Sequence, residues 1–168
     1  MNNLEFEVRL GVHTGSGISS NVGQSAYSKI VSLLRSARSL KESVLKETVT
    51  YFDNHVRTSL DSPTGFEKKR KLRQEDEQYL GYNIRYCKSV EQAVPNEKVA
   101  KRQTILRRKH RLRFESDHMV YDLTHVENTD TFEVEIEMKK CFASVHSEYL
   151  VKESLVKEMK HLLTCANL

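Results

Sequence analysis

The sequence has few cysteines and no long apolar run, and both absences exclude classes of protein. Its three cysteines are Cys87, Cys141 and Cys165, and none belongs to the Cys-x-x-Cys pair that is typical of structural zinc sites. An odd number of cysteines without such a pair favours reduced thiols. No stretch approaches the ~20 apolar residues of a transmembrane helix, and the first residues show no apolar signal run. We therefore expect a soluble, intracellular protein.

The composition predicts one domain with an economical core. The chain has 168 residues, of which 38% are hydrophobic and 30% are charged, and this length suits a single domain spanning residues 1–168. Lysine and arginine together number 27 and the acidic residues 23, which gives a net charge of +4. This mildly basic balance permits a nucleic-acid partner but does not require one.

Two segments show the periodicity of amphipathic helices, and most of the remainder alternates with the two-residue period of strands. We expect helices over residues 25–40 and 147–163, the second with Glu148 in its first turn and Lys160 in its last. We expect eight strands, which begin near Leu4, Thr48, His55, Phe66, Tyr79, Thr104, His118 and Thr131. Turn-forming residues at 53–54, 61–65 and 116–117 separate several strands, and residues 93–101 are expected to form a loop.

Charged residues occupy one face of several predicted strands. In the first and last strands, carboxylates recur at every second position; these are Glu5, Glu7, Glu133, Glu135 and Glu137. Another strand aligns Lys109, Arg111 and Arg113. Any one of these strands fits an ordinary sheet with a solvated face. Together, a self-repelling acidic strand and a basic one favour a closed barrel with a polar interior, in which carboxylates hold a hard cation and basic side chains hold a polyanion.

Seven segments carry motifs that together resemble one known family. Two are glutamate strands, at residues 5–11 and 132–137. The others are an arginine motif at residues 55–61, a lysine motif at 66–69, a glutamate motif at 82–91, a Lys-x-Arg motif at 107–111 and an Asp-Leu-Thr motif at 122–127. Their order is similar to that of the fungal and viral RNA 5′-triphosphatases of the triphosphate tunnel metalloenzyme family. The resemblance covers most of the chain and implies a mainly β (α+β) fold: an eight-stranded antiparallel closed β-barrel with flanking helices.

The resemblance also implies a reaction and a site. The reaction is removal of the γ-phosphate from 5′-triphosphate RNA, the first step of mRNA capping, with Mg²⁺ or Mn²⁺ bound by Glu5, Glu7 and Glu137. Glu91 would orient the attacking water. Basic residues would bind the phosphates: Arg57, Arg85, Lys109, Arg111 and either Lys68 or Lys69, and of these Arg57, Lys109 and Arg111 would also be catalytic. A further set would orient these side chains and the metal-bound waters: Asp122, Thr124, Glu133 and Glu135.

Three alternatives fit part of the pattern. A tunnel enzyme could act on inorganic tripolyphosphate or on a small triphosphate, and the Arg57 and Asp-Leu-Thr strands favour the RNA type instead. A non-catalytic scaffold of the same fold should have lost charged residues, yet both glutamate strands are intact. A basic RNA-binding barrel without catalysis fits poorly, because dense carboxylates repel phosphate unless metal is bound.

Partners and location are also expectations at this level. The sequence has no Lys-x-Asp-Gly motif of nucleotidyl transfer, so a capping guanylyltransferase would be a separate chain or lie outside this sequence. No membrane partner is expected, and the protein would be a monomer or homodimer. It would be nuclear if cellular, and cytoplasmic or in the virion if viral. The charged faces carry no aromatic residue that could stack on a base, so the first nucleotide of the RNA should matter little.

Overall fold

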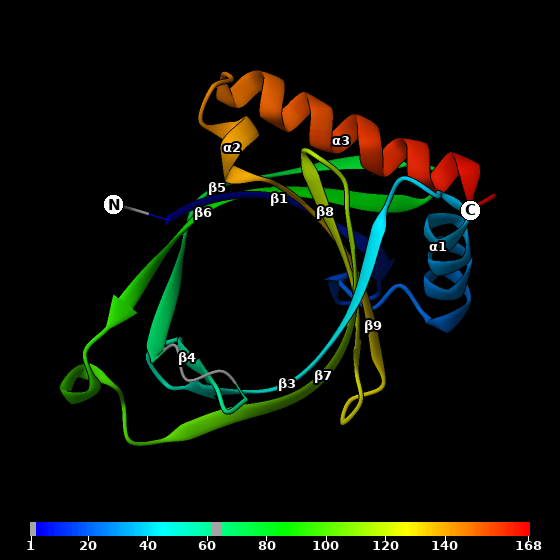
Figure 1. The fold of residues 1–168 in the computed structure, drawn as a ribbon. Coiled ribbons are helices and arrows are strands. Elements are labelled where there is room, and N and C mark those ends of the chain that lie inside the picture. The colour runs from blue at the N-terminus through cyan, green and yellow to red at the C-terminus, as the bar shows by residue number, and fades with distance from the viewer. Residues whose placement is uncertain (1–2, 62–64) are drawn as a thin grey trace.

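The strands of the protein form a closed barrel (Figure 1). The computed structural model describes residues 3–61 and 65–168, and within them eight antiparallel strands pair in the order β1-β6-β5-β4-β3-β7-β8-β9, with β9 returning to β1. The strands are β1 (Asn3–Thr14), β3 (Lys41–Phe52), β4 (Val56–Ser59), β5 (Phe66–Tyr79), β6 (Tyr82–Val94), β7 (Gln103–Glu115), β8 (Met119–Val126) and β9 (Thr131–Met138). The predicted eight-stranded antiparallel barrel is therefore confirmed.

The hydrophobic core lies outside the barrel, between its wall and two helices. In β1, Val8 and Leu10 are fully buried, whereas the alternate residues Glu5 and Glu7 line the barrel interior. Period-two alternation forces this division, because successive side chains leave a strand on opposite sides. The helices α1 (Gln24–Ser36) and α3 (Glu148–Cys165) cover the apolar side of β1, β8 and β9 (Figure 1).

Helix α3 forms as the sequence pattern predicts. Its buried residues recur at helical spacing and include Val151, Leu155, Met159 and Leu162. The Ser147 side chain caps its start by accepting a hydrogen bond from the Leu150 backbone N–H at 3.3 Å, which satisfies one of the free N–H groups of the first turn. The helix packs against β1, β6 and β9, the strands that bring the predicted glutamates together.

Several boundaries differ from the expectation. Helix α1 ends at Ser36 and not near residue 40, and β3 begins at Lys41, seven residues before the predicted start. The early half of β3 is exposed and has no clear alternation; pairing with β7 over its whole length, starting at Lys41 with Glu115, makes it a strand. Strand β6 continues to Val94, and a short 3₁₀ helix, η1 (Asn96–Lys98), occupies the predicted loop.

Other elements were not anticipated. A three-residue strand, β2 (Gly17–Ser19), pairs with the end of β1 outside the closed barrel, and α2 (Lys140–Ala143) precedes α3. Turns occur at residues 53–54 and 116–117 as predicted, while residues 62–64 of the predicted 61–65 turn lie outside the described residues. No helix within the described ranges is long and apolar enough to span a membrane.

The hairpin between β5 and β6 sets the register of two predicted site residues. It turns at Leu80 and Gly81, both of which have positive φ angles of 49° and 80°, as the commonest two-residue hairpin turns require. Counting back from this turn, across one irregularity near Lys71, Lys69 pairs with Glu91. The two residues consequently face the same side of the sheet.

The outer core should account for much of the stability. Leu155 is fully buried, so Leu155→Ala should lower the free energy of unfolding by about 2–5 kcal/mol through lost burial and an unfilled cavity. Lys157→Ala, at an exposed position of the same helix, should change it by less than about 0.5 kcal/mol. Urea unfolding of both variants would measure this, and equal stabilities would contradict the placement of the core.

Candidate active site

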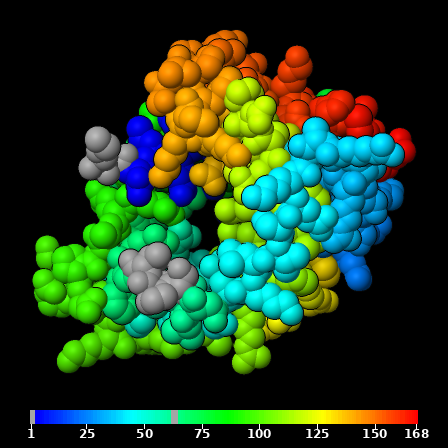
Figure 2. All heavy atoms as spheres, in the orientation of Figure 1, coloured from blue at the N-terminus to red at the C-terminus, as the bar shows by residue number. Residues whose placement is uncertain are grey.

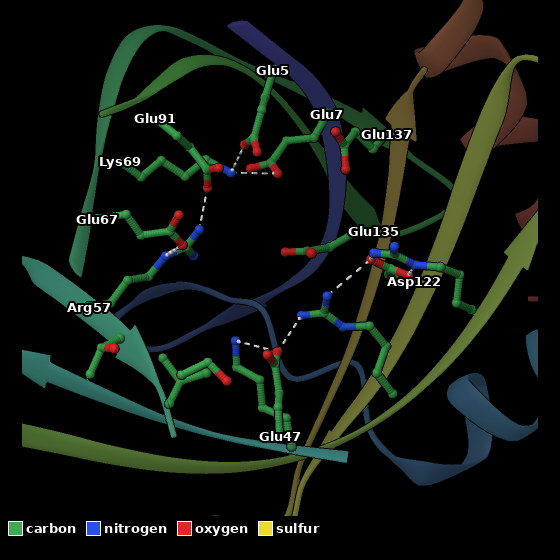
Figure 3. Close-up of a pocket in the computed structure, with 16 residues that line it drawn as sticks. Glu5, Glu7, Glu47, Arg57, Glu67, Lys69, Glu91, Asp122, Glu135 and Glu137 are labelled. Atoms are coloured by element: carbon green, nitrogen blue, oxygen red, sulfur yellow. Dashed lines mark hydrogen bonds and ion pairs between the residues drawn. The ribbon is translucent and has the colours of Figure 1, made fainter. Parts of the chain in front are cut away.

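The barrel encloses a charged cavity of about 260 Å³. Figure 2 shows its opening in the middle of the molecule, and Figure 3 shows the side chains that surround it. The described residues that line it are Glu5, Glu7, Glu47, Val49, Arg57, Thr58, Ser59, Glu67, Lys69, Glu91, Lys109, Arg111, Arg113, Asp122, Glu135 and Glu137. Eight of these are acidic and five are basic. The cavity can therefore attract a polyanion only where its excess negative charge is offset.

Three of the acidic side chains lie together on one wall (Figure 3). Glu5 and Glu7 project from β1, and Glu137 projects from β9, directly across the strand pair from Glu7. The Lys69 ammonium lies between the first two, with its Nζ 2.7 Å from Glu5 Oε2 and 2.9 Å from Glu7 Oε2. Among the described residues Glu137 has no ion-pair partner, so this wall keeps uncompensated negative charge.

This crowding changes the ionisation of the wall. Burial, and then the charges of Glu5 and Glu7, raise the pKa of Glu137 to about 7. Burial, followed by the charge of Glu135, also raises the pKa of Glu7, although Lys69 and Arg9 oppose the shift. Burial alone would lower the pKa of Lys69, but the two glutamates outweigh it and raise that pKa. A further positive charge would therefore stabilise the ionised carboxylates.

A hard divalent cation suits this wall in its chemistry. Oxygen-only carboxylate ligands are those preferred by Mg²⁺ and Mn²⁺, and Lys69 is the one cation among the described residues that pairs with Glu5 and Glu7 from inside the cavity, while Glu137 has none. In their present positions, no three acidic, histidine or cysteine side chains of the described residues converge closely enough to form a metal site. The Lys69 ammonium occupies the space between Glu5 and Glu7, and cation binding would have to displace it.

Arg57 connects the acidic wall to the opposite side. It comes from the short strand β4, donates from Nε to Glu67 Oε1 at 2.8 Å, and forms a second ion pair with Glu91. Burial and the neighbouring charge of Glu5 raise the pKa of Glu91 to about 7, against the opposing effect of Arg57. Glu91 is thus a carboxylate that can exchange a proton near neutral pH while an arginine fixes its position.

The basic side chains of β7 line the cavity as a ladder. Lys109, Arg111 and Arg113 occupy alternate positions of the strand and differ in their ion pairing. Lys109 is 3.9 Å from Glu47, and burial, together with Arg111 and Arg107, lowers its pKa. Arg111 is 3.3 Å from Glu47. Lys109 is therefore a cation with little compensation, whereas Arg111 also lies 3.3 Å from Asp122; both face the cavity, as a phosphate-binding surface requires.

Asp122 orients the two arginines of the ladder. It accepts two hydrogen bonds from Arg113, at 2.8 and 2.7 Å, and is 3.3 Å from Arg111 Nη1. The Arg111 Nε also donates to Thr124 Oγ1 at 3.3 Å. Both guanidinium planes are therefore fixed by β8 before any ligand arrives.

Two further ion pairs involve the glutamates of β9. Glu135 pairs with Arg9, and although burial would raise its pKa, Arg9 and Arg111 lower that pKa to about 2. Glu133 accepts from Arg107 at 2.8 Å and from Ser20 at 3.0 Å. Glu133 and Arg107 do not line the cavity; they form part of its support.

The predicted site residues fall into two groups. Those that line the cavity are Glu5, Glu7, Arg57, Lys69, Glu91, Lys109, Arg111, Asp122, Glu135 and Glu137. Lys68 does not line it, because alternation turns this residue to the other face of β5 from Lys69. Arg85 lies at a smaller separate cavity and is held by Asp76 at 2.8 Å. Thr124 and Glu133 do not line it either: Thr124 accepts from Arg111, and Glu133 accepts from Arg107, which is itself outside the lining.

Sequence reasoning missed several lining residues. Glu47 and Glu67 pair with the basic side chains described above, and the Ser59 hydroxyl is buried without a hydrogen-bond partner among the described residues. Tyr51 lies on the interior face, directly across from Arg57, so an aromatic residue does occupy a charged face. Alternation of Glu47, Val49 and Tyr51 along β3 was the available signal, but their mixed chemistry concealed it.

The unequal pairing of Glu137 and Glu135 leads to opposite pH effects. Between pH 4.5, the ordinary pKa, and about pH 7, the pKa in the folded protein, Glu137 is ionised in the unfolded chain but still protonated in the folded one. Its contribution to stability therefore falls as the pH rises through this range. Glu135, with a pKa near 2, contributes stability that is present above 4.5 and lost as pH falls towards 2. In chelator at pH 8, Glu137→Gln should therefore raise the free energy of unfolding by about 2 kcal/mol.

Glu135→Gln is the matched control, because it should destabilise the protein at pH 8 by leaving Arg9 without its carboxylate. The gain from Glu137→Gln should disappear near pH 4.5. Urea unfolding at the two pH values measures both effects. A loss of stability in Glu137→Gln at pH 8 would mean that this carboxylate has a partner.

Comparison with known proteins agrees with this architecture. No protein-family model matches the chain, and no curated protein matches its sequence. Two structures of the S. pombe RNA triphosphatase Pct1, one of them in complex with the Spt5 CTD, align with TM-scores of 0.73 and 0.71 at 15% identity, over 97% of this chain and 84% of theirs. The RNA triphosphatase domain of a mimivirus mRNA capping enzyme aligns with a TM-score of 0.54 at 13% identity, over 99% of this chain and 90% of that one. The chain therefore has the tunnel fold of these RNA triphosphatases.

Proposed function

We propose that this protein is a metal-dependent RNA 5′-triphosphatase that releases the γ-phosphate from triphosphate-ended RNA. The observation that carries this proposal is the cavity itself, which combines an undercompensated acidic wall with fixed basic side chains inside a closed barrel. Hydrolysis of a terminal phosphoanhydride needs both: charge stabilisation on the phosphoryl oxygens and a positioned water. The fold shared with Pct1 and the mimivirus domain supports the same function.

Glu5, Glu7 and Glu137 would hold the metal, Mg²⁺ or Mn²⁺. When bound, such an ion supplies Lewis-acid stabilisation of charge on the phosphoryl oxygens. Lys69 lies within hydrogen-bond distance of Glu5 and Glu7, so its ammonium would be released from them and become available to phosphate. Glu135, held ionised by Arg9, would add negative charge to the cavity lining beside this metal.

The basic residues would bind the triphosphate, and Glu91 would orient and deprotonate the attacking water. Arg57, Lys109 and Arg111 donate to phosphate oxygens, and the planar guanidinium groups allow two parallel hydrogen bonds each. A Glu91 carboxylate oxygen accepts a proton from the attacking water, whose oxygen forms the new bond to the γ-phosphorus while the bond to the β–γ bridging oxygen breaks. The products are orthophosphate and a diphosphate-ended RNA.

Capping of mRNA would be the context of this reaction. A diphosphate end is the substrate of a capping guanylyltransferase, which we propose as the partner enzyme. Inorganic tripolyphosphate or a small triphosphate is the second candidate substrate, because the cavity binds the triphosphate group that all of these share. A non-catalytic scaffold is disfavoured by the intact charge pairing of the cavity.

The direct test offers the purified protein triphosphate-ended RNA and inorganic tripolyphosphate, with Mg²⁺, with Mn²⁺ and with chelator. We expect metal-dependent release of orthophosphate from RNA, with a diphosphate end identified by chromatography. Glu5→Gln should reduce the rate by at least about 100-fold, while its circular dichroism spectrum stays that of the wild type. Release of pyrophosphate, or undiminished activity in chelator, would overturn the proposal.

A second variant separates phosphate clamping from general electrostatic attraction. Arg111→Lys keeps the positive charge but loses the planar fork and the contact from Nε to Thr124, so kcat/KM should fall by about tenfold. Arg108→Lys, at an exposed position of the same strand, is the control and should behave as the wild type. Unchanged rates in both variants would favour a nonspecific electrostatic strip.

A further inference from the structure

The two ends of the barrel interior are chemically different. Cross-strand pairing and alternation place Arg107, Lys109, Arg111 and Arg113 in sequence along one face of β7. The side-chain exposure is lowest at Lys109, 8%, and rises on both sides of it: to 24% for Arg107 in one direction, and to 17% for Arg111 and 33% for Arg113 in the other. Lys109 therefore lies at the closed part of the cavity, and Arg113 marks the end that opens to solvent.

Charge compensation changes in the same direction. At the closed part, the Lys109 ammonium has no carboxylate oxygen nearer than 3.9 Å among the described residues. At the open end, Arg113 is neutralised by the two-pronged contact with Asp122. The terminal phosphate of a triphosphate carries more negative charge than the inner ones, so it is favoured at the less compensated end of the ladder.

Arg113 nevertheless retains donors for a ligand. A guanidinium group has five N–H donors, and the contacts to Asp122 use one on Nε and one on Nη2. The remaining three can reach an inner phosphate or the first phosphodiester while Asp122 holds the plane. The residue is thus oriented, exposed and only partly used.

One apolar side chain near the open end, that of Leu45, lies outside the hydrophobic core. Leu45 is 44% exposed, and it lies on the same face of β3 as Glu47 and Val49, which line the cavity. It pairs across the strands with Arg111, which makes Arg113 its diagonal neighbour. An exposed leucine at the rim of a charged cavity suits the ribose and base of a nucleoside, which have apolar faces.

The opposite end differs in its charge pairing. Arg107 pairs with Glu133 there, Arg9 pairs with Glu135 on the adjoining strand β9, and neither arginine lines the cavity. An exposed apolar residue is also present at that end, since Ile105 is 54% exposed and shares a face with Arg107. Ile105 is therefore the residue with which Leu45 is compared in the test, because the nucleoside would lie near it if the RNA entered in the opposite orientation.

Building on the proposed function, we propose that triphosphate-ended RNA enters with its γ-phosphate leading and that its first nucleoside lies against Leu45 and Arg113. These two residues then distinguish a nucleoside-bearing substrate from inorganic tripolyphosphate. Leu45 offers no hydrogen bond to a base, so the contact favours any nucleoside over none and does not select among bases.

The test compares kcat/KM on triphosphate-ended RNA and on inorganic tripolyphosphate for single variants. Leu45→Asn and Arg113→Gln should each lower the value on RNA by about tenfold, mainly through KM, and lower the value on tripolyphosphate much less. Val44→Asn, at the exposed outward position beside Leu45, and Arg108→Gln, on the outer face of β7, should leave both values unchanged. Arg113→Lys keeps the charge and guards against a folding defect.

Three results are possible and each is decisive. Selective loss on RNA in Leu45→Asn and Arg113→Gln supports the proposed orientation. Selective loss in Ile105→Asn, or equal effects of Leu45→Asn and Arg113→Gln on both substrates, overturns it while the triphosphatase function stands. A wild-type protein that hydrolyses tripolyphosphate but not RNA refutes the RNA function itself, and the orientation falls with it.

Discussion

Repulsion among carboxylates inside the barrel is the constraint on which the rest of the structure depends. Eight acidic and five basic side chains surround one cavity in the described residues, and in a poorly solvated interior like charges raise one another's pKa. Cationic side chains lie beside most of these carboxylates and offset the repulsion. Lys69 lies between Glu5 and Glu7, Arg57 beside Glu91, and Arg9 beside Glu135. What is left uncompensated is the wall at Glu137.

Such an interior is possible because the core lies elsewhere. The apolar faces of β1, β8 and β9 pack outward under α1 and α3, so stability does not depend on filling the barrel with side chains. Closure of β9 on β1 then supplies the two glutamate strands to the same wall. A charged cavity therefore coexists with an ordinary hydrophobic core, separated by one layer of strand.

All but one of the basic residues of the cavity are held by a carboxylate on another strand, and this has a functional consequence. Arg57 is fixed by Glu67, and Arg113 by Asp122. Their hydrogen-bond donors are therefore oriented before a ligand binds, and these side chains lose little further conformational entropy on binding. Lys109 is the exception, since it is buried with a lowered pKa and no close carboxylate. Lys109 is accordingly the least compensated cation of the ladder.

The sequence by itself determined the barrel strands, the long helix and most of the cavity residues, because alternation of charge with apolar residues in β1, β7 and β9 fixes which side chains share a face. The tertiary structure decided the rest. Strand β5 is charged on both faces, so only its register with β6 distinguishes Lys69 from Lys68. The early half of β3 is a strand because β7 pairs with it. Arg85 lies at a second cavity and is held by Asp76, a cross-strand neighbour that no periodicity identifies.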